Sequence, residues 1–240
     1  MAYQFDEHMA TPSAMLDIAR GHWNNVKAKH IFGFNRTIGT SFETIFNDGG
    51  GIYQFPSAAI TLTAVSSSAA DTMDLVIEGL DADYNPVIDT VTLTGTVAAS
   101  SNIQFFRINN AYIAGGENAG NITIANGGVT YAYIEANTGV SQNAIYTVPA
   151  GCKMYINNVQ FSSGTANPNK YLTGRIYSKS HPSNAVQRFW QATWSTSEMS
   201  YSVPLPFAIP EKTDFAFEAK SSSGENEIAV YVNAFVIDNE

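Results

Sequence analysis

Residues 227–237 read Glu-Ile-Ala-Val-Tyr-Val-Asn-Ala-Phe-Val-Ile, and this stretch decides the fold class. Successive side chains of a β-strand point to opposite faces, so the apolar even-numbered residues from 228 to 236 share one face. Tyr231, Phe235 and Ile237 occupy the other face. Because both faces are apolar enough to be buried, the stretch predicts a central strand or a strand covered by a partner.

The strand-like pattern extends from this stretch back to Ile31, as runs of Thr, Val, Ile, Tyr and Phe between clusters of Gly, Asn, Asp and Ser. Residues 60–65 alternate Ile-Thr-Leu-Thr-Ala-Val and end in the polar connection Ser66-Ser67-Ser68. Short strands at such spacing predict an all-β sandwich or jelly roll. The other predicted strands cover residues 42–46, 52–55, 74–78, 87–94, 103–108, 122–125, 131–135, 145–148, 154–161, 171–177, 188–193, 201–205 and 215–219.

The 240 residues suit two domains of ordinary size. Residues 137–143 are polar and small, as a hinge between domains would be. The sequence therefore predicts two tandem antiparallel β-sandwich domains of the jelly-roll or immunoglobulin-like kind, at 31–137 and 138–240. A short N-terminal arm, residues 1–30, precedes them.

One helix is predicted in this arm. Thr11-Pro12 offers an N-cap and a proline at the first helical position, before a helix over residues 13–20 that Gly21 ends. So short a helix needs a host surface, which is either its own first domain or a neighbouring subunit. The candidate docking residues are Met15, Leu16, Ile18 and Trp23.

Composition narrows the possible partners. Charged residues form only 14% of the chain, the formal net charge is −9, and no basic block stands out. Direct nucleic-acid binding is therefore not expected, because such binding needs clustered basic residues. No apolar run is long enough for a membrane helix, and the single cysteine, Cys152, excludes an intrachain disulfide.

Most candidate metal-binding and catalytic motifs in the sequence match their patterns poorly. Residues 81–85 read Asp-Ala-Asp-Tyr-Asn, like the start of a calcium loop, but Pro86 replaces the turning glycine and Thr92 the bidentate glutamate. An acidic hairpin turn is the favoured interpretation. The four histidines lack zinc-motif spacing, Cys152 suits a small core position, and no nucleophile or nucleotide motif occurs. We therefore predict no catalytic residue, metal or cofactor, and no enzyme.

Aromatic residues of the second half leave two alternatives open. A sugar-binding platform could be formed by Phe189, Trp190 and Trp194, with Tyr171 and Tyr177 nearby in sequence, since flat rings present apolar faces to sugar C–H groups. Core or interface packing is the other reading, because Trp and Tyr are enriched there too.

Several segments together resemble a type of virion structural protein common in marine and freshwater tailed phages. The resemblance is one of pattern across most of the chain, and Asp89 departs from it where glutamate would be expected. The segments that carry it are residues 32–35 (Phe-Gly-Phe-Asn), 64–71 (Ala-Val-Ser-Ser-Ser-Ala-Ala-Asp), 77–81 (Ile-Glu-Gly-Leu-Asp), 89–95 (Asp-Thr-Val-Thr-Leu-Thr-Gly), 106–109 (Phe-Arg-Ile-Asn), 146–151 (Tyr-Thr-Val-Pro-Ala-Gly) and 209–214 (Ile-Pro-Glu-Lys-Thr-Asp).

The resemblance implies a place in the virion, after assembly in the host cytoplasm. It implies a capsid decoration or cement protein, or alternatively a tail or fibre-associated protein whose second domain binds a host-surface glycan. The implied partners are the major capsid protein or tail proteins, and further copies of the chain, as in a homotrimer. An arm such as residues 1–30 would extend across a neighbour and become ordered on binding.

Overall fold

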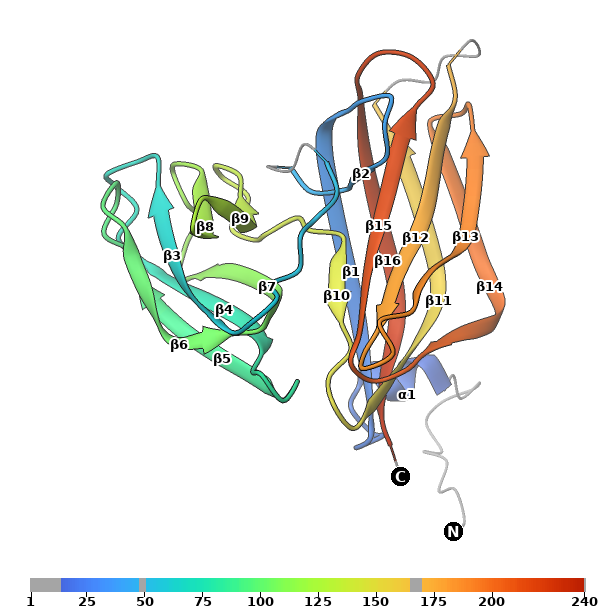
Figure 1. The fold of residues 1–240 in the computed structure, drawn as a ribbon, viewed down its shortest axis with the longest axis horizontal. Coiled ribbons are helices and arrows are strands. Elements are labelled where there is room, and N and C mark those ends of the chain that lie inside the picture. The colour runs from blue at the N-terminus through green and yellow to red at the C-terminus, as the bar shows by residue number, and fades with distance from the viewer. Residues whose placement is uncertain (1–13, 48–50, 165–169, 240) are drawn as a thin grey trace.

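The computed structural model describes residues 14–47, 51–164 and 170–239, and within them the chain is all-β apart from the short helix α1 (Ala14–Ala19). The strands form two lobes that lie side by side (Figure 1). Every strand pairing is antiparallel, as the sequence predicts.

The larger lobe contains two sheets that enclose a common core. The first sheet has the order β1-β16-β11-β14, with bounds β1 (Val26–Ile38), β16 (Asn226–Asp238), β11 (Cys152–Ser163) and β14 (Glu198–Ile209). The second has the order β10-β15-β12-β13, with β2 pairing β15, and bounds β10 (Ile145–Thr147), β15 (Thr213–Ser221), β12 (Leu172–Ser180), β13 (Val186–Trp194) and β2 (Glu43–Thr44).

Strand β16 is central, because it pairs with β1 on one side and with β11 on the other. Its face of Ile228, Val230 and Val232 is fully buried against the second sheet, from which Phe215 and Phe217 fill the core. The prediction of a central strand is confirmed. Its opposite face is only partly covered, since Tyr231 remains 37% exposed.

The smaller lobe also contains two sheets around one core. Their orders are β6-β3-β8-β9 and β5-β4-β7. The core includes Leu62, Leu75, Phe105 and Ile122, and it extends to Ile145 on a strand of the larger lobe. The bounds are β3 (Ile60–Ser66), β4 (Asp74–Leu80), β5 (Pro86–Thr92), β6 (Ala99–Phe105), β7 (Arg107–Ala114), β8 (Ile122–Asn126) and β9 (Val129–Ile134).

The two lobes are nested in the chain rather than arranged in tandem. Strands β1 and β2 pair with β16 and β15, so residues 26–30 are not part of an arm and residues 31–44 do not belong to the sheets of the first predicted domain. The smaller lobe is inserted between β2 and β10. The predicted boundaries differ because alternation within a segment identifies a strand but carries no information about its distant partner.

The segment predicted as a hinge is bonded on both sides. Ser141 N donates to Ala111 O and Phe34 N donates to Gln142 O, which ties residues 137–143 to β7 and to β1. Ser141 and Asn143 are buried. The polar and small residues of 137–143 are therefore explained by the hydrogen bonds that connect this segment to both lobes.

Helix α1 confirms the predicted helix, and Gly21 follows it with φ +73°. The left-handed conformation suits glycine after a helix end. Thr11-Pro12, the predicted start of the helix, lies outside the described residues.

Two predicted strands differ in the structure. The run 103–108 is divided between β6 and β7 at Phe106, whose N–H donates to Leu80 O instead of continuing either strand. Residues 52–55 form no strand, because Tyr53 turns into the core and donates its hydroxyl to Tyr131 O. In both places a tertiary contact replaces the regular ladder.

The serine-rich connection after β3 is organised by Asp71, which is fully buried. Its carboxylate accepts hydrogen bonds from Ser66 Oγ at 2.5 Å, Ala119 N at 2.7 Å and Gly120 N at 2.9 Å. Burial alone raises the pKa of the Asp71 carboxyl, but these three bonds outweigh burial and hold the pKa below its ordinary value. The carboxylate thus fastens this connection to the loop before β8.

Asp71→Asn tests the role of this carboxylate in stability. A carboxyl with a lowered native pKa stabilises the fold above its unfolded pKa of about 3.9, and this stability is lost as the pH falls through the native value. We expect the variant to lose about 1 to 3 kcal/mol of unfolding free energy at neutral pH, because buried donors lose their acceptor. It should also lose less stability on acidification than the parent chain. Urea unfolding from pH 7 to pH 3 measures both effects.

The control is Asp83→Asn, which removes an exposed carboxylate from the hairpin loop. It should unfold like the parent chain at every pH. Equal acid sensitivity of the Asp71 variant and the parent would contradict the prediction.

Candidate functional site: the inter-lobe junction and the aromatic face

A buried ion pair joins the two lobes. Arg107 begins β7 of the smaller lobe, Asp214 lies on β15 of the larger lobe, and both are at most 2% exposed. Arg107 Nε donates to Asp214 Oδ1 at 2.6 Å and Nη2 donates to Oδ2 at 2.9 Å. This bidentate geometry is the strongest form of an arginine–carboxylate contact.

The remaining polar atoms of the pair are also satisfied. Arg107 Nη1 donates to the carbonyl oxygens of Pro56 at 2.8 Å and Phe106 at 2.7 Å. Thr147 Oγ1 donates to Asp214 Oδ1 at 2.7 Å, and His181 Nε2 lies 3.0 Å from Oδ2. Such complete pairing is required before a buried ion pair can offset the loss of hydration.

Aromatic rings shield the junction from water. The guanidinium carbon of Arg107 lies 3.9 Å from the ring centroid of Phe106 and 5.6 Å from those of Tyr84 and Phe55. Burial raises the pKa of Tyr84, although the positive charge of Arg107 opposes the shift. The arrangement fixes the lobes relative to each other, because both oxygens of Asp214 and all three guanidinium nitrogens of Arg107 have hydrogen-bond partners.

Further bonds connect the lobes beside the ion pair. Asn109 Nδ2 donates to Thr147 O at 3.0 Å, and Thr147 N donates to Asn109 Oδ1 at 2.8 Å. Ala150 N donates to Tyr84 O at 2.9 Å. Sequence reasoning missed this junction, and the available signal was slight: a single charged residue between two apolar ones, as in Phe106-Arg107-Ile108.

The outer side of β1 and β16 exposes a second feature. His30, Phe32 and Phe34 of β1 lie beside Tyr231 and Phe235 of β16, and these five side chains are called the aromatic face below. Phe32 pairs directly with Tyr231, and the two are 42% and 37% exposed. The sequence predicted Tyr231 and Phe235 on one face, but not the rings of β1 beside them.

Part of the aromatic face is held in a fixed arrangement. The rings of His30 and Tyr231 are stacked, with centroids 6.0 Å apart and an interplanar angle of 7°. His30 Nδ1 lies 2.9 Å from Tyr231 Oη and 2.7 Å from Asn233 Oδ1. The face therefore presents ordered rings to solvent.

The predicted docking residues lie before β1. Leu16 and Trp23 are each 39% exposed, while Ile18 is half-buried. The side chain of Met15 lies outside the described residues. Leu16 and Trp23 thus remain available for contact, and docking itself stays a prediction.

The predicted aromatic platform is not assembled. Trp194 is 7% exposed and lies in the core of the larger lobe, which leaves its ring no face for a sugar. Trp190 is half-buried and stacks on Phe161, with ring centroids 5.7 Å apart. Tyr177 packs toward the core of the smaller lobe. Alternation alone did not show that the tryptophans point between the sheets of the larger lobe.

Cys152 and the acidic loop have structural roles. Cys152 packs at the margin of the larger core, and burial, followed by the nearby Asp238, raises the pKa of its thiol to about 11. The thiolate is therefore scarce at neutral pH. Asp81 caps the β4–β5 loop by accepting bonds from the backbone N–H groups of Asp83 and Asn85, which agrees with a hairpin turn.

Two kinds of feature are absent from the described residues. They contain no group of three His, Cys, Asp or Glu side chains placed to hold a metal ion. They also contain no helix with the length and apolar character that crossing a membrane would require.

Comparisons with known proteins place the chain in no family. No family model matches it, and no curated protein matches it. Weakly similar solved structures come from infectious bursal disease virus. The structure of its Gt strain is 10% identical with a TM-score of 0.22, covering 89% of this chain and 73% of that one. Its VP2 subviral particle is 8% identical with a TM-score of 0.20, covering 90% and 77%. Scores this low carry no argument about function.

Arg107→Met tests the junction. Removing one partner leaves the Asp214 carboxylate buried without its counter-charge, and we expect a loss of about 3 to 5 kcal/mol in unfolding free energy. Urea unfolding followed by tryptophan fluorescence measures it. The matched control is Arg36→Met, which breaks the more exposed Arg36–Glu135 pair and should change stability by less than about 1 kcal/mol. Equal losses for the two variants would contradict the assigned role of Arg107.

Proposed function

We propose that the chain is a non-enzymatic structural protein of a tailed-phage virion, most simply a capsid decoration or cement protein that bridges neighbouring subunits. The aromatic face is the observation that carries this proposal. Clustered rings exposed to water favour protein–protein contact, because interface centres are enriched in aromatic residues and depleted of charge.

The geometry of the face supports a permanent contact. The stacked His30 and Tyr231 rings need little further ordering on binding, which lowers the entropy lost in association. Phe32 beside them supplies an apolar ring, the type of residue that often dominates binding energy. A neighbouring subunit, either the major capsid protein or another copy of this chain, would cover these rings.

The inter-lobe junction supports a mechanical role. A bridging protein transmits force only if its own parts do not move apart, and the Arg107–Asp214 pair fastens one lobe to the other with hydrogen bonds at 2.6 and 2.9 Å. The low share of charged residues, 14%, also suits a surface made for repeated contacts. Leu16 and Trp23 would add apolar area to the same or a second contact.

Copy number tests the proposed place in the particle. Quantitative mass spectrometry of purified virions, normalised to the major capsid protein, should find on the order of hundreds of copies, because closed icosahedral shells repeat each contact many times. A cryo-electron microscopy map should show them at icosahedral positions. About a dozen copies at one vertex would move the protein to the tail, and absence from purified virions would refute the proposal.

Charged substitutions on the aromatic face test whether this face contacts a neighbouring subunit. In the double variant Phe32→Glu/Tyr231→Glu, buried carboxylates would lack partners in the interface, and we expect incorporation into particles to fall at least about tenfold. The control is Ile88→Glu on the smaller lobe, where the parent side chain is 65% exposed. Full occupancy by the double variant, with circular dichroism confirming that it is folded, would exclude the aromatic face as the contact.

A further inference from the structure

The aromatic face is part of a larger surface, the outer side of the sheet β1-β16-β11-β14. Residues that pair across neighbouring strands point to the same side of a sheet, and Val230 and Val232 mark the core side of β16. The opposite side carries four rows of side chains, called the outer sheet face below. The rows, from β1 outward, are Ala28, Phe235 and Tyr155; His30, Asn233, Asn158 and Ser202; Phe32, Tyr231, Gln160 and Ser200; and Phe34, Ala229, Ser162 and Glu198.

The interior of the outer sheet face carries no carboxylate, ammonium or guanidinium group. Within the four rows, Glu198 at one corner is the single Asp, Glu, Lys or Arg residue. Lys153 follows at the opposite end, since it pairs with Ile237 beyond the first row. The outer side of the second sheet differs, because Asp214 and Glu218 of β15 form ion pairs there. The uncharged interior is therefore a property of this face and not of the whole larger lobe.

The outer sheet face is accessible to solvent. Phe32 is 42% exposed and Tyr231 37%, Ser200 is exposed, and Gln160 is half-buried. The smaller lobe packs on the other sheet, where Arg107 reaches Asp214 on β15. The rings and amides of the outer sheet face are therefore open to a partner.

The dimensions of the sheet allow a stable contact. Neighbouring strands lie about 4.8 Å apart and an antiparallel strand rises about 3.4 Å per residue, so four strands along the 13 residues of β16 measure roughly 19 by 44 Å. The flat area is on the order of 800 Å², which is what each partner buries in a protein–protein interface of standard size. The sheet alone therefore offers enough surface for a specific partner.

We propose that the outer sheet face binds a second copy of this chain, so that the two sheets pack face to face in a two-fold symmetric dimer. This inference rests on the proposed function, which makes the aromatic face a protein contact, and it names the partner. In a two-fold contact both copies present the same patch, so a charge near the axis meets its own counterpart. Rows without charge avoid this repulsion, whereas a contact with a different protein could use charges of opposite sign.

The charged residues at the two ends of the face also suit a second copy. Sheets that pack face to face keep their strand directions within about 30° of each other. When the strands of the two copies run antiparallel, the end with Lys153 lies over the end with Glu198 of the second copy. Opposite charges at the rim of an interface add little affinity, but they favour one orientation over others.

Sedimentation velocity of the full-length protein at neutral pH tests the dimer. The chain should sediment with twice its own mass and a dissociation constant of about 1 μM or lower, because interfaces of standard size range from micromolar to picomolar. A chain that remains monomeric up to about 200 μM, far above that constant, would overturn the inference. A trimer would overturn it as well, because it excludes a two-fold contact.

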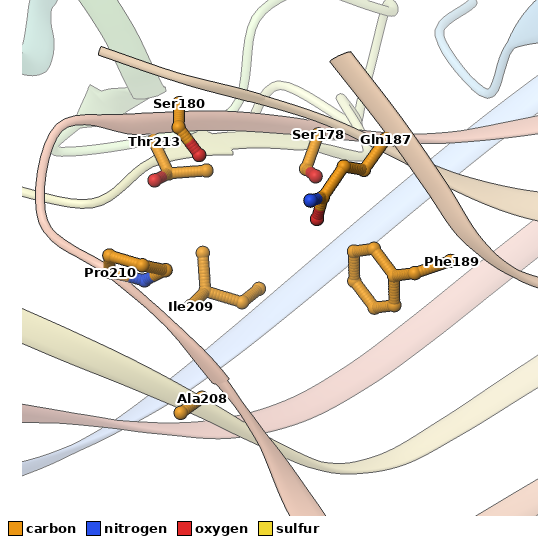
Figure 2. A pocket seen from close by; sticks show the side chains of 8 residues that line it. All are labelled: Ser178, Ser180, Gln187, Phe189, Ala208, Ile209, Pro210 and Thr213. Carbon is orange, nitrogen blue, oxygen red and sulfur yellow. The ribbon is translucent and has the colours of Figure 1, made fainter. Parts of the chain in front are cut away.

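Two matched exchanges of glutamine for glutamate locate the contact. Gln160→Glu keeps the shape of the side chain but brings like charges of the two copies together, and it should weaken the dimer at least about tenfold. The control is Gln187→Glu, which adds the same charge at the pocket between β13 and β14 drawn in Figure 2. This pocket opens between the edges of the two sheets and not on the outer sheet face, so the control should dimerise like the parent chain.

The outcomes separate this inference from the proposed function. Equal dimerisation by Gln160→Glu and the parent chain, with circular dichroism showing the variant folded, would overturn the second copy as the occupant of the face. A monomer that still enters virions through Phe32 and Tyr231 would also overturn it, because the capsid protein would then cover the rings, and the proposed function would stand. A dimer that Gln160→Glu disrupts but that is absent from virions would support the inference and refute the proposed function.

Discussion

The pairing of β1 with β16 is the constraint on which the rest of the structure depends. It joins residues 26–38 to residues 226–237, so both ends of the described chain lie in one sheet. The face of β16 that fills the core is completed only when β1 and β11 lie on its two sides. The larger lobe therefore forms only after residues 226–237 have been made. Contacts this distant in sequence slow folding, because the entropy of loop closure is lost before the contact is gained.

Because the smaller lobe is inserted into the chain of the larger lobe, the orientation of the two lobes must be fixed, and the buried ion pair fixes it. Two chain crossings connect the lobes, one after β2 and one before β10, and they alone would allow relative motion. The Arg107–Asp214 pair adds a contact that tolerates only one orientation, because both its N–H groups must meet both carboxylate oxygens. Apolar residues would stabilise such a junction at least as well, so we attribute the buried pair to orientation rather than to strength.

The sequence predicts the elements well and their partners poorly. Alternation predicted the central strand β16 and most other strands, because each depends on a local pattern of buried and exposed residues. Alternation did not predict that β1 belongs to the larger lobe. A strand that carries Phe32 and Phe34 could have paired with any apolar strand edge. Nor did it show that Trp194 faces the core, because a wide ring is compatible with either side of a strand.

The order of the strands determines where the aromatic face lies on the larger lobe. Sheet order β1-β16-β11-β14 places β1 at one edge and β14 at the other. The aromatic face occupies the β1–β16 side of this sheet. A subunit covering the rings of β1 would leave the opposite edge in solvent. The stacked His30 and Tyr231 rings are already arranged in the free chain, so a contact through this side of the sheet requires no change in the sheet itself.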